Sequence, residues 1–205
     1  NTMLRVGDLS QDINTTIATN PEIKDFMLKH NKQTIEHSFN LVTCFFAIHY
    51  MFETEEILDT FLKNVSTLIE DNGIFVLTTL DGRKVEEKLL ESDSCIWDVS
   101  ISKEKRIAEL KIENKGDFNS NQTKFGKKIK ATVYEGTQER FSDIEYLVDF
   151  DVLKGKLKEN FFQIVQEIDF EKVYKVFGQG KKWRFILDPK EMEYSFCNKY
   201  LICRK

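Results

Sequence analysis

The stretch Phe39–Glu53, FNLVTCFFAIHYMFE, decides the fold of this chain. Its first half is an apolar run with the length of a buried strand. The polar and aromatic pair His49-Tyr50 stands where that strand would end. Because ligand sites in open α/β sheets lie outside the carboxyl ends of the strands, we expect a site at this pair. The alternative is a core strand that is followed by an ordinary loop.

A helix and a second strand are predicted directly after this stretch. Apolar residues recur at helical spacing from Ile57 to Ile69, and Asn72-Gly73 marks the stop. The run Ile74–Thr79 then reads as another buried strand. Strand, helix, glycine and strand form a βαβ unit, so the sequence predicts an α/β fold with neighbouring parallel strands.

The rest of the chain is predicted to complete one domain over residues 1–205, with an inserted β region at 93–150. Alternating residues between 93 and 139 suggest antiparallel strands, and Phe141–Phe150 reads as a loop that contains Glu145. Further expected elements are a strand at 3–7, helices at about 22–28, 84–91 and 152–162, and strands at 162–170 and 199–203. The expected strand at 3–7 ends at Asp8, which is suited either to cap a helix or to accept hydrogen bonds from a ligand.

Composition restricts the class of protein. The 205 residues have a formal net charge of −4 and 41% hydrophobic content, which suits one domain with a real core. Lysine and arginine cluster at residues 126–130 and 180–184, so a locally held polyanion is allowed, although extensive coating of a nucleic-acid backbone is not expected. We see no signal peptide and no apolar run long enough for a membrane span.

The four cysteines do not form a CxxC pair or a zinc-like spacing. They are Cys44, Cys95, Cys197 and Cys203, and most of them have apolar neighbours. We therefore expect reduced core residues of a cytoplasmic protein.

Several motifs in order resemble the mRNA cap guanine-N7 methyltransferases. Besides Phe39–Glu53, they are Leu62–Phe75, Phe125–Ile129 (FGKKI), Glu145–Val148 (EYLV) and the closing Lys199–Ile202. The resemblance covers most of the chain and is closest to the methyltransferase domain of capping enzymes from large DNA viruses. It implies a Rossmann-like class I fold that depends on S-adenosylmethionine.

The implied reaction transfers a methyl group from S-adenosylmethionine to N7 of the cap guanine. N7 has a free lone pair and no proton, so in-line displacement requires alignment and exclusion of water but no acid or base. The resemblance therefore implies binding residues and no catalytic proton donor or acceptor.

The resemblance also implies roles for particular residues. His49, Tyr50, Glu145 and Tyr200 would contact the cap guanine, with Glu145 accepting from N1–H and the exocyclic amine. Other interpretations are a hydrogen-bonded loop histidine for His49, a surface carboxylate for Glu145 and a core residue for Tyr200. The lysine pairs at 127–128 and 181–182 would either contact the triphosphate bridge or form solvated faces.

The cofactor would be contacted by Asp8, Leu9, Phe45 and Tyr50. Phe45 is a departure from the family, which usually has Gln there, and a side-chain hydrogen bond is thereby lost. A glycine loop of the form D-x-G-x-G is missing upstream of Asp8. We therefore expect a longer protein, or another capping subunit, to supply the missing strands between those ending at Asp8 and Ile48.

Three functions remain open. The leading one is a cap guanine-N7 methyltransferase, within an mRNA capping enzyme, acting on 5′-capped RNA (GpppN). The second is a catalytically silent methyltransferase-like subunit that stabilises or stimulates a capping partner, and the third is a methyltransferase for another acceptor. The expected location is the cytoplasm, including a viral factory or virion.

Overall fold

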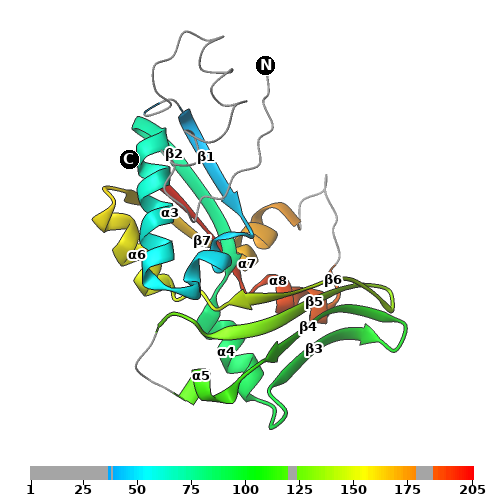
Figure 1. The fold of residues 1–205 in the computed structure, drawn as a ribbon. Helices are drawn as coiled ribbons and strands as arrows, with labels where there is room; N and C mark the ends of the chain where they lie inside the picture. Colours follow the sequence, from blue (N-terminus) through cyan, green and yellow to red (C-terminus); the bar gives the residue numbers. More distant parts are fainter. Residues whose placement is uncertain (1–36, 38, 120–123, 179–186) are drawn as a thin grey trace, which may run out of the picture.

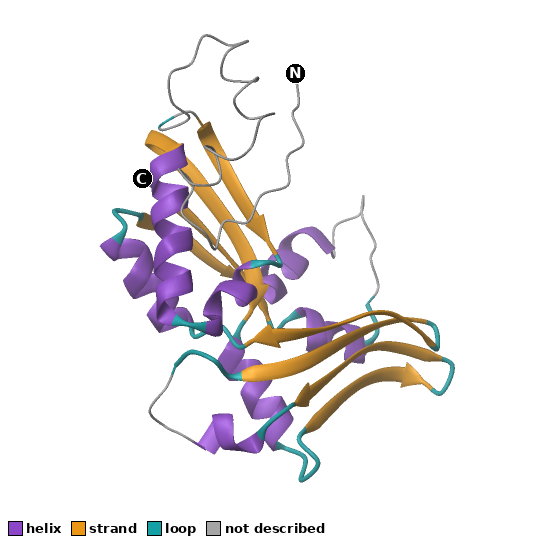
Figure 2. Cartoon of the chain, in the orientation of Figure 1, coloured by secondary structure: helices purple, strands orange, loops and turns teal. Residues whose placement is uncertain are grey.

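The structure is a computed structural model that describes residues 37, 39–119, 124–178 and 187–205. The expected strand at 3–7, the helix at about 22–28, Asp8 and Leu9 therefore lie outside the described residues, as do Lys181 and Lys182. The described residues form two four-stranded sheets with helices against them (Figures 1 and 2).

The first sheet has the strand order β1-β2-β8-β7. Its strands are β1 (Phe39–Phe45), β2 (Ile69–Leu80), β7 (Gln163–Asp169) and β8 (Asn198–Arg204). The β1–β2 pair is parallel, whereas β8 runs antiparallel to both β2 and β7. Helix α3 (Glu55–Leu68) connects β1 to β2, which confirms the predicted βαβ unit.

Local chemistry explains where α3 begins and how β2 follows it. The Thr54 hydroxyl accepts a hydrogen bond from Ile57 N at 3.2 Å and caps the helix. The register between β1 and β2 shifts near Gly73, where a Cβ atom would lie 2.7 Å from Cγ1 of Ile69. This close approach requires glycine. Asn72-Gly73, which was expected to end the helix, therefore lies in a bulge near the start of β2, and β2 is longer than predicted.

The main core lies between the first sheet and helices α3 and α6 (Phe150–Glu159). Phe52, Phe75 and Phe162 are among its largest fully buried side chains. The rings of Phe75 and Phe162 are 5.7 Å apart between centroids. The ring of Phe75 also lies 6.4 Å from that of Phe61 in α3, so aromatic contacts hold β2 against α3 and against the segment that follows α6.

The prediction that β1 is buried is wrong for the described part of the chain. Phe39, Leu41 and Phe45 are 43%, 57% and 55% exposed. Val42 and Cys44, on the alternate face, pack against the core. No described strand pairs with the other edge of β1, and no described element covers its outward apolar side chains, so the apolar run has only one buried face.

The second sheet has the strand order β3-β4-β5-β6, with every neighbouring pair antiparallel. Its strands are β3 (Ile96–Ser102), β4 (Lys105–Ile112), β5 (Lys128–Glu135) and β6 (Gln138–Tyr146). The antiparallel strands are thus confirmed, but the predicted loop is wrong, because Glu145 belongs to β6. Glu145 pairs with Ile129, and this backbone pairing extends the strand through the polar segment.

Short elements complete the two units. Predicted α4 (Gly82–Leu90) is confirmed, and it packs with α8 (Pro189–Ser195) on one face of the second sheet. The other short elements are η1 (Ile48–Glu53), α5 (Lys115–Asn119), α7 (Phe170–Val173) and η2 (Tyr174–Gly178). The sequence patterns did not indicate α7, η2 or α8.

The two sheets meet where β2 passes into α4. Asp81 N donates to the carbonyl oxygen of Cys197 at 2.8 Å, and Gly82 N donates to that of Val148 at 2.9 Å. A Cβ atom on Gly82 would lie 2.6 Å from the Val148 oxygen, so only glycine permits this approach. This junction fixes β6 relative to the end of β1.

The four cysteines are free thiols, and three of them are buried, as predicted. None of the helices in the described part of the chain has the length and apolar character needed to cross a bilayer.

Candidate functional site

A cavity of about 450 Å³ opens at the carboxyl end of β1, between the two sheets. Its size is within the usual range of small-molecule sites. Its walls are mainly aromatic and apolar, with a few polar groups. The lining residues are Phe46, His49, Tyr50, Leu80, Val133, Phe141, Glu145, Phe170, Tyr194, Ser195 and Asn198.

The turn after β1 brings His49 and Tyr50 to this cavity. Phe46 has a positive φ of 51°, and its N–H donates to the carbonyl oxygen of Thr78 at 2.9 Å, which ends the strand. Ile48 and Phe52 in η1 are fully buried and anchor the turn. The rings of His49 and Tyr50 lie 4.2 Å apart between centroids, so they form one aromatic wall.

Strand β6 supplies the acidic wall. Asp143 and Glu145 are two residues apart and therefore share one face of the strand. The Tyr50 hydroxyl donates to Oδ2 of Asp143 at 3.1 Å. Nε2 of His49 lies 3.8 Å from Oε1 of Glu145, which is close enough for an electrostatic contact but too long for a hydrogen bond.

Burial shifts the pKa values of His49 and Glu145 in opposite directions. Desolvation lowers the pKa of His49 to about 4, against a smaller opposing effect of the Asp143 charge. Desolvation raises the pKa of Glu145 to about 7, and the Asp143 charge adds to this rise. His49 is therefore neutral near pH 7, whereas Glu145 titrates there.

Tyr194 is a cavity residue that the sequence patterns did not indicate. It lies on α8, whose start is fixed by a capping box between Asp188 and Glu191. Its ring contacts Trp97 edge-on at 5.8 Å between centroids. Burial, with a smaller effect of the Glu145 charge, raises the pKa of Tyr194 to about 12, so its hydroxyl stays protonated. The capping box is the sequence feature from which α8 could have been predicted.

The structure brings three of the predicted residues together and places two others nearby. His49, Tyr50 and Glu145 line the cavity. Phe45 is not among the lining residues and directly precedes Phe46, which is. Tyr200 is not a lining residue either; it pairs with Thr78 in the middle of the sheet.

Tyr200 nevertheless shares a face of β8 with Asn198, which lines the cavity. Oδ1 of Asn198 and Nε2 of His49 are buried and have no hydrogen-bond partner among the described residues. Asn198 Nδ2 donates to the carbonyl oxygen of Ser195 at 3.1 Å, which fixes the orientation of the amide. The cavity is thus bordered by polar atoms that its own residues leave unsatisfied.

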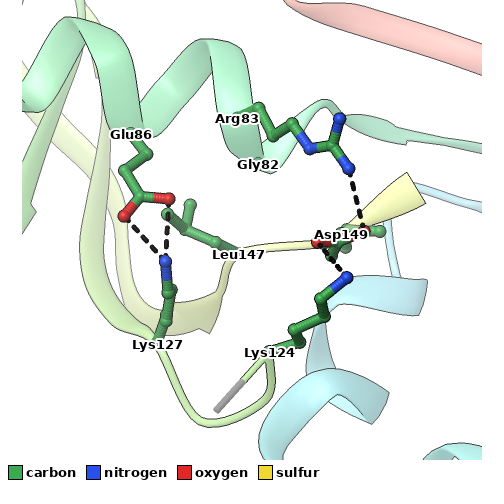
Figure 3. Close-up of a pocket in the computed structure, with 8 residues that line it drawn as sticks. Gly82, Arg83, Glu86, Lys124, Lys127, Leu147 and Asp149 are labelled. Atoms are coloured by element: carbon green, nitrogen blue, oxygen red, sulfur yellow. Dashed lines mark hydrogen bonds and ion pairs between the residues drawn. The ribbon is translucent and has the colours of Figure 1, made fainter. Parts of the chain in front are cut away.

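A second, much smaller cavity of about 40 Å³ lies by the start of α4 (Figure 3). Lys127 points at Glu86, with Nζ–Oε1 and Nζ–Oε2 distances of 2.7 and 2.9 Å. Lys124 approaches Asp149 at 3.7 Å, and Arg83 contacts Asp149 at 3.6 Å. Because carboxylates balance these cations, this cavity is a poor site for a triphosphate.

The larger cavity is suited to a planar base with hydrogen-bond donors on one edge. Aromatic rings offer stacking surfaces, and the carboxylate of Glu145 is an acceptor for two parallel donors. The described lining residues do not include a lysine or an arginine. Over the described ranges, no group of three or more His, Cys, Asp or Glu side chains is arranged for a metal ion.

Comparison with known proteins gives a family match. Residues 10–188 match the family model of the mRNA (guanine-N(7))-methyltransferase domain. A "Probable mRNA-capping enzyme" of Acanthamoeba polyphaga mimivirus is 25% identical over 168 residues, which cover 75% of this chain and 13% of the relative. An mRNA cap guanine-N(7) methyltransferase of Caenorhabditis briggsae is 27% identical over 140 residues, which cover 66% of this chain and 33% of the relative.

This chain therefore spans one third or less of each of these two relatives. Among solved structures, the CcbJ methyltransferase from Streptomyces caelestis is 14% identical with a TM-score of 0.49, covering 84% of this chain and 63% of that one. An S-adenosylmethionine-dependent methyltransferase from Clostridium acetobutylicum is 14% identical with a TM-score of 0.46, covering 90% and 72%. The fold class rests on the strand order and the family match.

Proposed function

Since the chain belongs to the mRNA (guanine-N7)-methyltransferase domain family, we propose that it binds the cap guanine of GpppN RNA for methylation at N7. The observation that carries this proposal is the cavity with Glu145 and His49 side by side in its lining, 3.8 Å apart at their nearest polar atoms. The predicted α/β, Rossmann-like fold agrees with this family.

Glu145 would recognise guanine through its Watson–Crick edge. Guanine presents N1–H and an exocyclic amine side by side, and one carboxylate can accept from both. Adenine has no N1–H donor at this edge, so the same carboxylate would discriminate against it. The aromatic pair His49 and Tyr50 would hold the base plane, and Tyr200 would contact the cap from the same face of β8 as Asn198.

The residues at the end of β1 fit the methyl-donor end of S-adenosylmethionine. Tyr50 and Phe46 place aromatic faces beside the cavity, and such faces attract a sulfonium cation. The cofactor supplies an electrophilic methyl group. The chain's own contribution is to orient the base and exclude water, because N7 needs no proton removed. Phe45, Asp8 and Leu9 are the further proposed cofactor contacts.

Residues 93–150 would act as a cap-binding insert within a single methyltransferase domain. The wider setting is an mRNA capping enzyme in the cytoplasm, in which the N-terminal part of the same protein or another subunit supplies the remaining strands. The named mimivirus relative, a capping enzyme much longer than this chain, supports this setting.

The test combines cap binding with methyl transfer. GpppG and ApppA binding would be measured by calorimetry with wild type, Glu145→Ala, and the exposed-strand control Glu139→Gln. We expect GpppG to bind at least tenfold more tightly than ApppA, and this preference to disappear only in Glu145→Ala, because hydrogen bonds to a charged group are lost. Equal affinity for both dinucleotides would overturn the proposal.

Transfer of a labelled methyl group to capped and uncapped RNA separates the leading function from the alternative. Transfer that requires the cap and Glu145 supports an enzyme. Cap binding that depends on Glu145 but is accompanied by no transfer, alone or with the rest of the capping protein, supports the silent stimulatory subunit. Transfer to uncapped RNA that persists in Glu145→Ala would identify another acceptor.

A further inference from the structure

Three exposed lysines gather on the face of the second sheet that is turned away from the cavity. We call this the outer face, and it carries Lys111 of β4 and Lys128 and Lys130 of β5. Ile129 alternates with the lysines of β5 and is buried against α4 and its neighbours on the inner face. Side chains alternate across a strand, so the three lysines share one surface.

The pairing register places like charges side by side. Lys111 pairs directly with Lys130 across β4 and β5, and Lys128 is two residues further along the same face. Like charges directly opposite each other destabilise an antiparallel pair. This arrangement therefore has a cost for the free protein.

These lysines are also without counter-ions in the part of the chain that the structure describes. Within residues 37, 39–119, 124–178 and 187–205, no carboxylate lies within 4 Å of the Nζ atom of Lys111, Lys128 or Lys130. By contrast, Arg106 of the same sheet contacts Asp98 at 3.3 Å and Glu109 at 2.8 Å. Glu109, the acidic residue two positions before Lys111, is thereby already engaged. A local excess of positive charge remains on the outer face.

Protection of a sheet edge does not explain these lysines. Lysines often guard edge strands against pairing with other chains. In the order β3-β4-β5-β6, however, Lys111, Lys128 and Lys130 lie on the two central strands. Solubility alone would be served equally by mixed charges, as found around Arg106. The unpaired cluster is better explained by an anionic ligand.

RNA is the polyanion that the neighbouring cavity suggests. Lys130 pairs with Ile144, the residue next to Glu145, so Lys130 and the proposed guanine contact lie on neighbouring strands and on opposite faces of the sheet. Nζ of Lys128 also lies 5.9 Å from the ring centre of Tyr146, which holds this lysine in place without neutralising it. Among the residues that the structure describes, the cavity lining has no lysine or arginine for phosphates, whereas the outer face carries such charge.

We propose that the outer face, through Lys111, Lys128 and Lys130, binds the phosphodiester backbone of RNA independently of its sequence. The inference rests on the proposed function only for the identity of the polyanion. Phosphate contacts of this kind add affinity and orient the chain, whereas base contacts determine specificity.

The experiment measures binding of an uncapped 20-nucleotide RNA by fluorescence anisotropy between 50 and 200 mM salt. The test variant is Lys111→Gln with Lys128→Gln and Lys130→Gln. The control variant, with the same net charge, is Lys63→Gln with Lys158→Gln and Lys172→Gln, three exposed lysines of the first unit. Each lost contact to single-stranded RNA lowers the slope of log K against log salt by about 0.7.

We expect the slope of the test variant to be smaller in magnitude by about 2, and that of the control variant to match wild type. Across the fourfold rise in salt, wild type then loses about 15-fold more affinity than the test variant. Equal slopes in wild type and test variant, or an equal fall in both variants, would overturn the proposal. So would competition by polyglutamate that is as effective as RNA of equal charge, which would assign the face to an acidic protein.

GpppG binding, measured in parallel, keeps the two proposals apart. A dinucleotide held in the cavity should bind the test variant, which lacks the three lysines, as tightly as it binds wild type. If GpppG fails to bind any variant while the RNA slope still depends on the three lysines, the proposed function fails and the RNA surface stands.

Discussion

The two faces of the second sheet differ in almost every physical respect. The inner face borders a cavity with aromatic rings, where Glu145 and His49 are largely buried and both pKa values are shifted by desolvation. The outer face carries Lys111, Lys128 and Lys130, whose side chains are exposed to water. One sheet therefore presents a surface for selective hydrogen bonding and a surface for charge.

The difference shows that the register between two strands can place two kinds of binding surface on opposite faces of one sheet. Successive side chains of β5 and β6 point to opposite faces, so a selective contact and a charged contact can be neighbours in sequence. The selective contact Glu145 lies on the inner face of β6, and on β5 the charged Lys130 lies on the outer face next to the buried Ile129. A one-residue slip in register would exchange the two surfaces.

Stability should respond very differently to truncation on the two faces. Leu110→Ala removes a fully buried inner-face side chain and should lower the free energy of unfolding by about 2–5 kcal/mol. Lys130→Ala should change it by less than about 0.5 kcal/mol, toward greater stability, because a like-charge pair is relieved. Urea denaturation measures both. Similar losses in the two variants would contradict the assignment of faces.

The pH dependence of stability should reveal two opposing contributions inside the cavity. From pH 4.5 to about 7, folded Glu145 keeps a proton that the unfolded chain has released, so its contribution falls by about 3 kcal/mol as pH rises. From about pH 4 to 6.5, unfolded His49 binds a proton that the folded protein does not, so its contribution rises by a similar amount. In wild type the two nearly cancel.

Each single variant should therefore expose the other contribution. Relative to wild type, Glu145→Gln should gain about 3 kcal/mol of stability as pH rises from 4.5 to 7, and His49→Gln should lose about as much from pH 4 to 6.5. Urea denaturation at half-unit pH steps provides the curves. Parallel curves for wild type and both variants would show that neither group is shifted by burial.

The charge of Asp143 should raise the pKa of the Glu145 carboxyl group. Guanine needs the charged form of Glu145, so GpppG affinity should rise with pH through its pKa, near 7. Asp143→Asn removes a like charge and should move this midpoint down by roughly half a unit. Calorimetric titrations from pH 5.5 to 8.5 would measure it.

Tyr50→Phe is the matched control for Asp143→Asn. It removes the 3.1 Å hydrogen bond to Asp143 but keeps the charge on the carboxylate. The midpoint should then stay within about 0.2 unit of wild type, because the charge and not the hydrogen bond acts on Glu145. An equal displacement in both variants would indicate a general disturbance of the rim.

A small gain in stability is expected from a charge reversal on the outer face. Lys111→Glu places opposite charges across the β4–β5 pair with Lys130 and should raise the free energy of unfolding by about 0.2–1 kcal/mol. The same change should weaken RNA binding. Lys63→Glu on α3 serves as the charge-matched control, and its RNA affinity should remain close to that of wild type. Weaker folding together with unchanged RNA binding in Lys111→Glu would contradict the outer-face proposal.

Parts of this molecule could be predicted from sequence because local chemistry decides them. The strand before His49, the helix after Thr54 and the strand after Gly73 follow from apolar periodicity, capping and glycine. His49 and Glu145 were indicated by resemblance, although Glu145 was expected in a loop. Backbone pairing with Ile129 extends β6 through Glu145, and local sequence propensity does not predict such pairing between strands.

Other parts depend on contacts that no local pattern encodes. Exposure of β1 depends on which strands lie beside it, and this is a property of the whole sheet. Tyr194 reaches the cavity only because α8 packs on β3 through Trp97. The like-charge pair Lys111–Lys130 depends on register between two strands, so the sequence showed a basic run but not its partner.

The central claim is that the cavity recognises guanine through Glu145. A crystal structure of this chain with GpppG tests it most directly. We predict a guanine in the cavity beside Tyr50 and β6, with its N1 and exocyclic amine within about 3 Å of the Glu145 carboxylate. A guanine bound elsewhere, or one held in the cavity with Glu145 turned away from it, would contradict the account.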